Sequence, residues 1–142
     1  MIPERYAPIT YALFRIVFGY LFLIFGLQKM FGLFGGQQAV LASLQGAAGI
    51  VETVCGLLIM LGLLTRPAAF LASGEMAVAF FYIHVNVIGL GGNGPGMPEA
   101  LLVPPMTMGE RSVMFCFAFL FIASRGAGIW SVDGARGGPT RR

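Results

Sequence analysis

Two ionisable residues lie deep inside long apolar segments of this sequence, and they carry its strongest chemical signal. A charge in the middle of a membrane span costs about 2.5 to 3.5 kcal/mol on insertion scales, so such residues are usually paired or functional. On helices that rise about 1.5 Å per residue, Arg15 and Glu75 fall at matching depths. We therefore predict an Arg15–Glu75 ion pair, with Tyr82 on the same helix face as Glu75.

A second group of polar residues is predicted at the opposite edge of the same segments. Lys29 ends the first apolar segment and Glu52 lies one turn into the second, so antiparallel neighbouring helices would bring the two within salt-bridge distance. An exposed pair of this kind contributes only about 0 to 1 kcal/mol. The same edge holds four further polar residues, namely Gln28, His84, Glu110 and Arg111.

The two layers together predict a polar cavity between the helices. Its candidate residues are Arg15, Gln28, Lys29, Glu52, Glu75, Tyr82, His84 and Glu110. A ligand-binding site is one interpretation of this pattern. The other is that the charges pair only with one another and hold the helices together as polar contacts inside the membrane. The residue types and their spacing assign no side chain a catalytic role.

Other kinds of chemistry find less support. His84 has no second histidine to help it hold a metal or a haem, so no metal site is predicted. Cys55 and Cys116 fall at similar depths, and they are interpreted either as small buried apolar side chains or as a transient dithiol. The sequence lacks a Cys-x-x-Cys motif, a glycine-rich phosphate loop and a nucleophile elbow. We expect no nucleic-acid partner.

The segments that position these residues are long and apolar. Of the 142 residues, 57% are hydrophobic and only 11% are charged, far from the composition of a soluble domain. Segments at about 9–31, 47–64, 68–90 and 109–125 are long enough to span a bilayer. Their continuous apolarity excludes the alternation of barrel strands. The sequence predicts an all-α fold, a four-helix transmembrane bundle that forms a single domain over residues 1–142.

The arginines predict the orientation of this bundle. An even number of spans places both termini on one side, together with the turn at Arg66. Cytoplasmic loops carry an excess of positive charge, and the arginines of this side are Arg5, Arg66, Arg125, Arg136, Arg141 and Arg142. We therefore expect both termini in the cytoplasm, with residues 126–142 forming a basic cytoplasmic tail and Trp130 acting as an interfacial anchor.

Several local patterns, taken together and in this order, resemble the DoxX family of bacterial membrane proteins over nearly the whole chain. They are Gly26-Leu27-Gln28-Lys29-Met30-Phe31-Gly32, Glu52 with Gly62-Leu63-Leu64-Thr65-Arg66, Gly74-Glu75-Met76-Ala77-Val78-Ala79 with His84, Gly109-Glu110, and Gly126-x-Gly128-x-x-Ser131-Val132-Asp133. Two positions depart from the family pattern. Phe25 stands where similar proteins often have a histidine, and Met106-Thr107-Met108-Gly109-Glu110 stands where they often have Asn-Gly-Gly-Glu.

The resemblance implies a four-helix bundle in the bacterial inner membrane and a kinship with the small subunit of thiosulfate:quinone oxidoreductase. The leading hypothesis is a membrane subunit of a redox system that binds a quinone, or a small sulfur or thiol compound, in the polar cavity. A non-catalytic assembly or accessory protein is one alternative. A small proton or anion carrier that uses Arg15 and Glu75 is the other. The expected partners are the lipid bilayer, a redox subunit and a second copy of the chain, and a quinone is the candidate cofactor.

Overall fold

The computed structural model describes residues 3–36, 38–84 and 109–137, and every regular element in these ranges is helical. The elements are η1 (Glu4–Tyr6), α1 (Ala7–Phe31), η2 (Leu33–Gly35), α2 (Leu44–Leu61), α3 (Thr65–Ala79), the π-helical segment η3 (Phe80–His84), α5 (Glu110–Arg125) and α6 (Val132–Ala135). This confirms the predicted all-α class. The predicted third segment runs on to residue 90, and its last six residues lie outside the described ranges.

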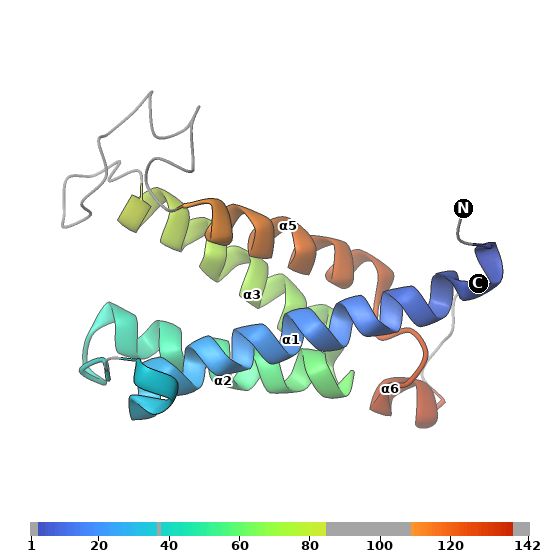
Figure 1. Cartoon of the computed structure of the whole chain (residues 1–142), viewed down its shortest axis with the longest axis horizontal. Coiled ribbons are helices and arrows are strands. Elements are labelled where there is room, and N and C mark those ends of the chain that lie inside the picture. Colours follow the sequence, from blue (N-terminus) through green and yellow to red (C-terminus); the bar gives the residue numbers. More distant parts are fainter. Residues whose placement is uncertain (1–2, 37, 85–108, 138–142) are drawn as a thin grey trace.

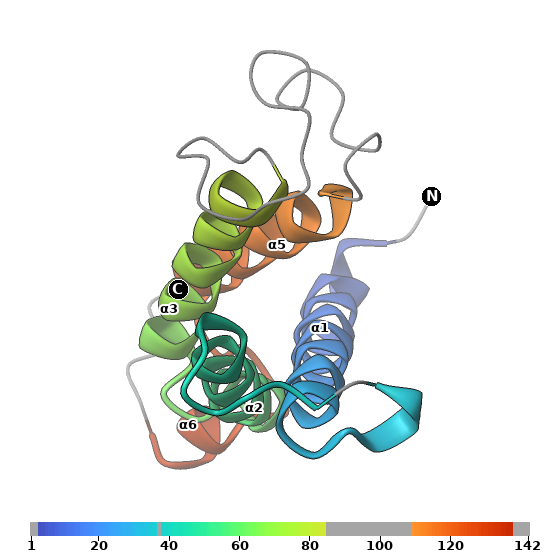
Figure 2. The same cartoon turned by 90° about the vertical axis from the view of Figure 1, so that its left-hand side faces the viewer.

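The backbones of the four long helices associate mainly as two pairs, α1 with α2 and α3 with α5, while α2 and α3 also pack together. Figure 1 shows that the two pairs come together near α6 and diverge toward the opposite side of the molecule. Figure 2 looks at the molecule from the side where the pairs diverge. We call the side near α6 the Arg15 end and the opposite side the Lys29 end, after the α1 residue that lies at each.

Glycines let α1 and α2 approach each other closely. A Cβ atom on Gly19 of α1 would lie 2.6 Å from the backbone nitrogen of Met60, and one on Gly56 of α2 would lie 2.5 Å from the backbone nitrogen of Leu23. Contacts this short leave no room for any side chain, so the two backbones pack directly against each other, as small residues allow in membrane helices. This close packing fixes which faces of α1 and α2 turn toward the other pair.

Aromatic side chains fill the space between the two pairs. Phe22 of α1 and Phe119 of α5 are fully buried, and their ring centroids lie 4.6 Å apart. Phe115, one turn earlier on α5, lies 5.7 Å from Phe22. Aromatic pairs at such distances add stabilisation beyond their burial. Four more aromatic side chains of α1 also lie against Phe115 or Phe121 of α5, namely Tyr11, Phe14, Phe18 and Phe25. The helices α1 and α5 therefore meet through aromatic side chains along most of their length.

The outer faces of the helices are apolar as well. Large hydrophobic side chains are exposed on all four long helices, among them Leu13, Leu57, Phe70 and Phe117. Two helical stretches in the described part of the chain, Glu4–Phe31 and Leu44–Leu61, are long and apolar enough to cross a membrane, with mean hydropathies of 1.9 and 1.8. Soluble proteins rarely expose apolar surface on this scale, so the surface is typical of a protein surrounded by lipid.

Candidate functional site

Arg15 lies fully buried at the junction of three segments and is held entirely by backbone carbonyl groups. Its Nη1 donates to the carbonyl oxygens of Ile59, at 2.6 Å, and Met60, at 2.8 Å, both in the last turn of α2. Its Nη2 donates to the carbonyl oxygen of Trp130 at 2.7 Å. The last carbonyls of a helix have no partner within the helix and attract positive charge. Arg15 therefore joins α1 to the end of α2 and to the segment after α5.

Asp133 completes this junction from the other side. Its carboxylate accepts hydrogen bonds from the backbone N–H groups of Leu64 and Thr65, each at 3.2 Å, and from the Thr65 hydroxyl at 3.3 Å. The Asp133 backbone N–H donates to the carbonyl oxygen of Gly62 at 3.0 Å. Free N–H groups at a helix start favour a carboxylate, so Asp133 caps α3. Residues 126–137 are thus packed against the helices.

The predicted Arg15–Glu75 ion pair is wrong. Arg15 lies level with the end of α2 and the start of α3, whereas Glu75 lies ten residues after Thr65, about 15 Å further along α3. The salt bridge of the described residues joins Lys29 to Glu52, and the Arg15 side chain donates to backbone carbonyls instead of to Glu75. The error came from the assumed starting depth of α1, which Figure 1 shows extending beyond the ends of the other helices.

The predicted contact between Lys29 and Glu52 is confirmed. Lys29 Nζ lies 2.6 Å from Glu52 Oε1. The Glu52 side chain is only 3% exposed, whereas that of Lys29 is 35% exposed. The second carboxylate oxygen, Oε2 of Glu52, is buried and has no hydrogen-bond partner among the described residues. The pair is therefore more buried than expected, and one of its acceptors is unsatisfied.

A cavity of about 190 Å³ opens beside this pair, where the two helix pairs diverge. Residues from α1, α2, α3, η3 and α5 line it, namely Phe22, Phe25, Lys29, Glu52, Met76, Ala79, Ile83, Arg111, Ser112 and Phe115. The Arg111 guanidinium lies 5.8 Å from the centre of the Phe25 ring. The cavity thus combines an aromatic wall with two cations, a carboxylate and a hydroxyl. Small-molecule sites are likewise mostly apolar with a few placed polar groups, although this cavity is smaller than most of them.

The other predicted cavity residues lie elsewhere or remain predictions. Arg15 belongs to the junction at the opposite end. Gln28, Glu75, Tyr82 and Glu110 do not line the cavity in the described part of the chain, although Glu75 and Glu110 each have one buried, unpartnered carboxylate oxygen among the described residues. The side chain of His84 lies outside the described residues.

The two cysteines are free. Cys55 lies in the hydrophobic core, and the Cys116 sulfur lies 3.5 Å from the hydroxyl of Ser73 on α3. The Ser73 hydroxyl also donates to the Cys116 backbone carbonyl at 2.8 Å. Neither cysteine lines the cavity.

Comparison with known proteins identifies the family of this chain. The DoxX family model matches residues 10–85, more than half of the chain. The chain belongs to the DoxX family. It is 36% identical over 134 residues to an uncharacterized protein of Haemophilus influenzae, covering 92% of each chain. It is 30% identical over 134 residues to the inner membrane protein YphA of Escherichia coli, covering 89% of each chain. No solved structure matches the chain.

The DoxX motifs of this chain divide between the two ends. The Gly62–Arg66 motif and the Gly126–Asp133 motif meet at the Arg15 junction. The Gly26–Gly32 motif and Glu52 meet at the Lys29 end, where Lys29 and Glu52 form their salt bridge beside the cavity. Motifs distant in the sequence thus serve one structural junction and one candidate binding site.

Of the ten residues that line the cavity, sequence reasoning named only Lys29 and Glu52 as candidates, and it missed the apolar lining and two polar residues. Arg111 was placed at the correct edge but outside the candidate site, and Ser112 was not considered. Both lie in the first turn of α5, directly after the Gly109-Glu110 motif. That motif was the available signal, because it marks the start of a helix at the predicted cavity, and the residues of the first turn lie next to it.

Proposed function

We propose that this DoxX protein forms a four-helix bundle across the bacterial inner membrane, with both termini in the cytoplasm. The apolar outer faces and the printed name of the Escherichia coli relative support this location. The arginines at the Arg15 end support the orientation, since Arg5, Arg66, Arg125 and Arg136 lie there. The positive-inside rule places the arginine-rich side in the cytoplasm.

The orientation can be tested with single cysteines in the full chain, after Cys55 and Cys116 are replaced by alanine. Val40→Cys lies between α1 and α2 at the Lys29 end, and Ala135→Cys lies in α6. A membrane-impermeant maleimide should label Val40→Cys in intact spheroplasts and Ala135→Cys only after permeabilisation. The reverse pattern would overturn the proposed orientation.

We further propose that the cavity at the Lys29 end binds the head group of a quinone or a small sulfur or thiol compound. The observation that carries this proposal is the group of hydrogen-bond donors, Lys29, Arg111 and Ser112, set among phenylalanine rings. The donors suit a carbonyl or anionic oxygen, and the rings suit a flat apolar ring. The unpartnered oxygen of Glu52 would accept a proton-bearing group of the ligand.

The proposal makes the chain a membrane subunit of a redox system and assigns electron transfer to a partner subunit. Support comes from the kinship with the small subunit of thiosulfate:quinone oxidoreductase that the family resemblance implies. A carrier that relays protons or anions between Arg15 and Glu75 is not supported, because Arg15 contacts backbone carbonyls of α2 and of the segment after α5. An accessory protein remains the competing function.

Binding of two probes, decylubiquinone and thiosulfate, to the purified full chain in mild detergent tests the cavity. We expect one of them to bind, and Arg111→Gln to weaken its binding about tenfold, the loss of roughly one charged hydrogen bond. Arg136→Gln, an exposed arginine of the opposite end, is the matched control and should leave binding unchanged. Failure of both probes, together with a tightly co-purifying subunit, would favour the accessory function.

A further inference from the structure

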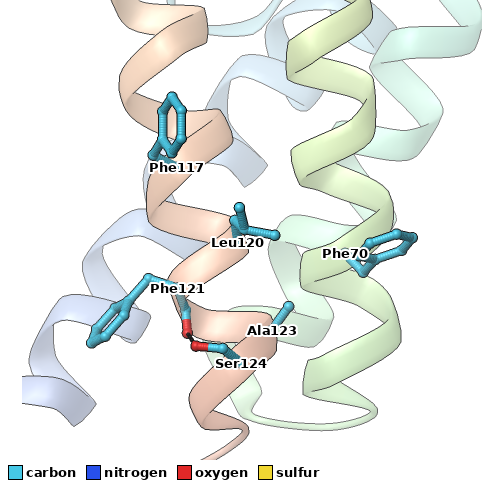
Figure 3. Close-up of a pocket in the computed structure, with 6 residues that line it drawn as sticks. All are labelled: Phe70, Phe117, Leu120, Phe121, Ala123 and Ser124. Atoms are coloured by element: carbon cyan, nitrogen blue, oxygen red, sulfur yellow. Dashed lines mark hydrogen bonds between the residues drawn. The ribbon is translucent and has the colours of Figure 1, made fainter.

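A second hollow lies on the outer face of α3 and α5, toward the Arg15 end. Its volume is about 490 Å³, and its lining residues are Phe70, Phe117, Leu120, Phe121, Ala123 and Ser124. Figure 3 shows Leu120 and Ala123 between the two helices, with Phe70 and Phe121 on either side. The Ser124 hydroxyl donates to the Phe121 carbonyl at 2.7 Å, so the groove surface is almost entirely apolar.

Two exposed arginines lie at the end of this groove that is nearer the Arg15 junction. Arg66 is four residues before Phe70 and Arg125 is four residues after Phe121, so each arginine shares a helix face with a groove residue. The Arg125 guanidinium lies 5.4 Å from the centre of the Tyr11 ring on α1 and 6.0 Å from the centre of the Phe121 ring.

The two arginines are also neighbours across the helices. The Arg66 guanidinium lies against Gly126, the residue after Arg125, where a Cβ atom would come 3.0 Å from Arg66 Nε. Gly126 has a φ of +86°, which favours glycine. The turn at Gly126 therefore brings the start of α3 and the end of α5 together, with an arginine on each.

No carboxylate neutralises these arginines in the described part of the chain. The salt bridge found there joins Lys29 to Glu52, at the opposite end. Asp133, the acid of the neighbouring junction, accepts its hydrogen bonds from Leu64 and Thr65. Two exposed guanidinium groups without an acidic partner present several donors to an anion, and phosphate oxygens match the planar geometry of these donors.

We propose that this surface binds one anionic phospholipid. Arg66 and Arg125 hold its phosphate, and an acyl chain lies along the groove over Phe70, Leu120 and Phe121. Phe117 lies eight residues from Arg125 along α5, about 12 Å of apolar surface below the phosphate level. Exposed Trp130, at the same end, suits the depth of lipid head groups. The site is separate from the cavity at the Lys29 end and does not depend on the ligand there.

Native mass spectrometry of the full chain in mild detergent tests the proposal, with phosphatidylglycerol and phosphatidylcholine offered in equal amounts. We expect about tenfold greater retention of phosphatidylglycerol. Both lipids can place an acyl chain in the groove, but only phosphatidylglycerol carries a net negative charge that the two arginines attract. Arg66→Gln with Arg125→Gln should abolish this preference. The matched pair Arg5→Gln with Arg136→Gln removes the same charge from the same end and should preserve it.

Two further variants separate binding from folding. Arg66→Lys with Arg125→Lys keeps both charges and should keep most of the preference, whereas Ala123→Phe fills the groove and should lower retention of both lipids. Equal retention of the two lipids by the unchanged chain would overturn the proposal, as would equal losses in the two glutamine pairs. A dimer without bound lipid that Ala123→Phe dissociates would show that a second copy occupies the groove and would also overturn it.

Discussion

Replacing Arg15 with methionine is expected to lower the free energy of unfolding in mild detergent by about 3 to 5 kcal/mol, because several buried or partly buried carbonyls then lose their donor. Methionine retains much of the apolar stem of arginine but donates no hydrogen bonds. The carbonyl oxygens of Ile59, Met60 and Trp130 would each lose a donor that now lies within 2.8 Å. We expect this substitution to be the most destabilising single change in the chain.

Two comparisons show whether the lost donors are the cause. Arg15→Lys keeps the charge but replaces the two donor nitrogens, which serve α2 and Trp130 separately, with a single ammonium nitrogen on a shorter side chain, so its loss should lie between those of the unchanged chain and Arg15→Met. Arg5→Met removes an exposed arginine from the same helix end and should leave stability almost unchanged. Equal stability of Arg15→Met and the unchanged chain in thermal unfolding would show that the junction is not needed.

The same substitution should release the segment after α5. Arg15 holds this segment through the Trp130 carbonyl, while Asp133 holds it through α3. Limited proteolysis of Arg15→Met should therefore cut residues 126–137 sooner than the rest of the chain. Loss of stability without faster cleavage there would mean that Arg15 acts only on α2.

Replacing Lys29 with methionine is expected to cost about 2 to 3 kcal/mol, because it leaves the buried Glu52 carboxylate without its partner. The sequence alone suggested at most about 1 kcal/mol, the usual value for an exposed pair. Glu52 is nearly inaccessible, which raises the expected value, and the partial exposure of Lys29 keeps it below that of a fully buried pair.

A double-mutant cycle measures this interaction directly. Lys29→Met, Glu52→Gln and the double substitution should give a coupling above about 1 kcal/mol, with the double variant more stable than the sum of the two losses predicts. The coupling should change little with added salt, because buried pairs are weakly screened. Additive losses, or a coupling that vanishes at high salt, would show that the pair behaves as an exposed one.

The two ends of the molecule differ in how many of their buried polar atoms have hydrogen-bond partners among the described residues. At the Arg15 junction, Arg15 and Asp133 bind backbone groups of α2, α3 and the segment after α5, and one buried side-chain atom, Nε of Arg15, has no partner in the described residues. At the Lys29 end, by contrast, Glu52, Glu75 and Glu110 each keep a buried oxygen without a partner in the described residues. Buried polar groups are normally satisfied, so the Lys29 end is the better candidate for a ligand.

The sequence by itself determined the helical class, the approximate starting positions of the long helices and the contact between Lys29 and Glu52. Each follows from local patterns. Continuous apolar segments favour helices in a membrane, and a short connection between two helices makes them antiparallel neighbours. The end of α1 and the start of α2 must then lie side by side, which brings Lys29 and Glu52 within salt-bridge distance of each other. The family was likewise identifiable from the sequence without a structure.

Only the tertiary structure decided what Arg15 binds and where the cavity lies. The partners of Arg15 are backbone carbonyls, and because every residue has a carbonyl, such partners leave no mark in the sequence. Relative helix depth was also undetermined, since α1 begins beyond the other helices and Glu75 consequently lies far from Arg15. The cavity exists because glycines hold α1 close to α2 while the second pair diverges from them, a balance of packing that involves all four helices at once.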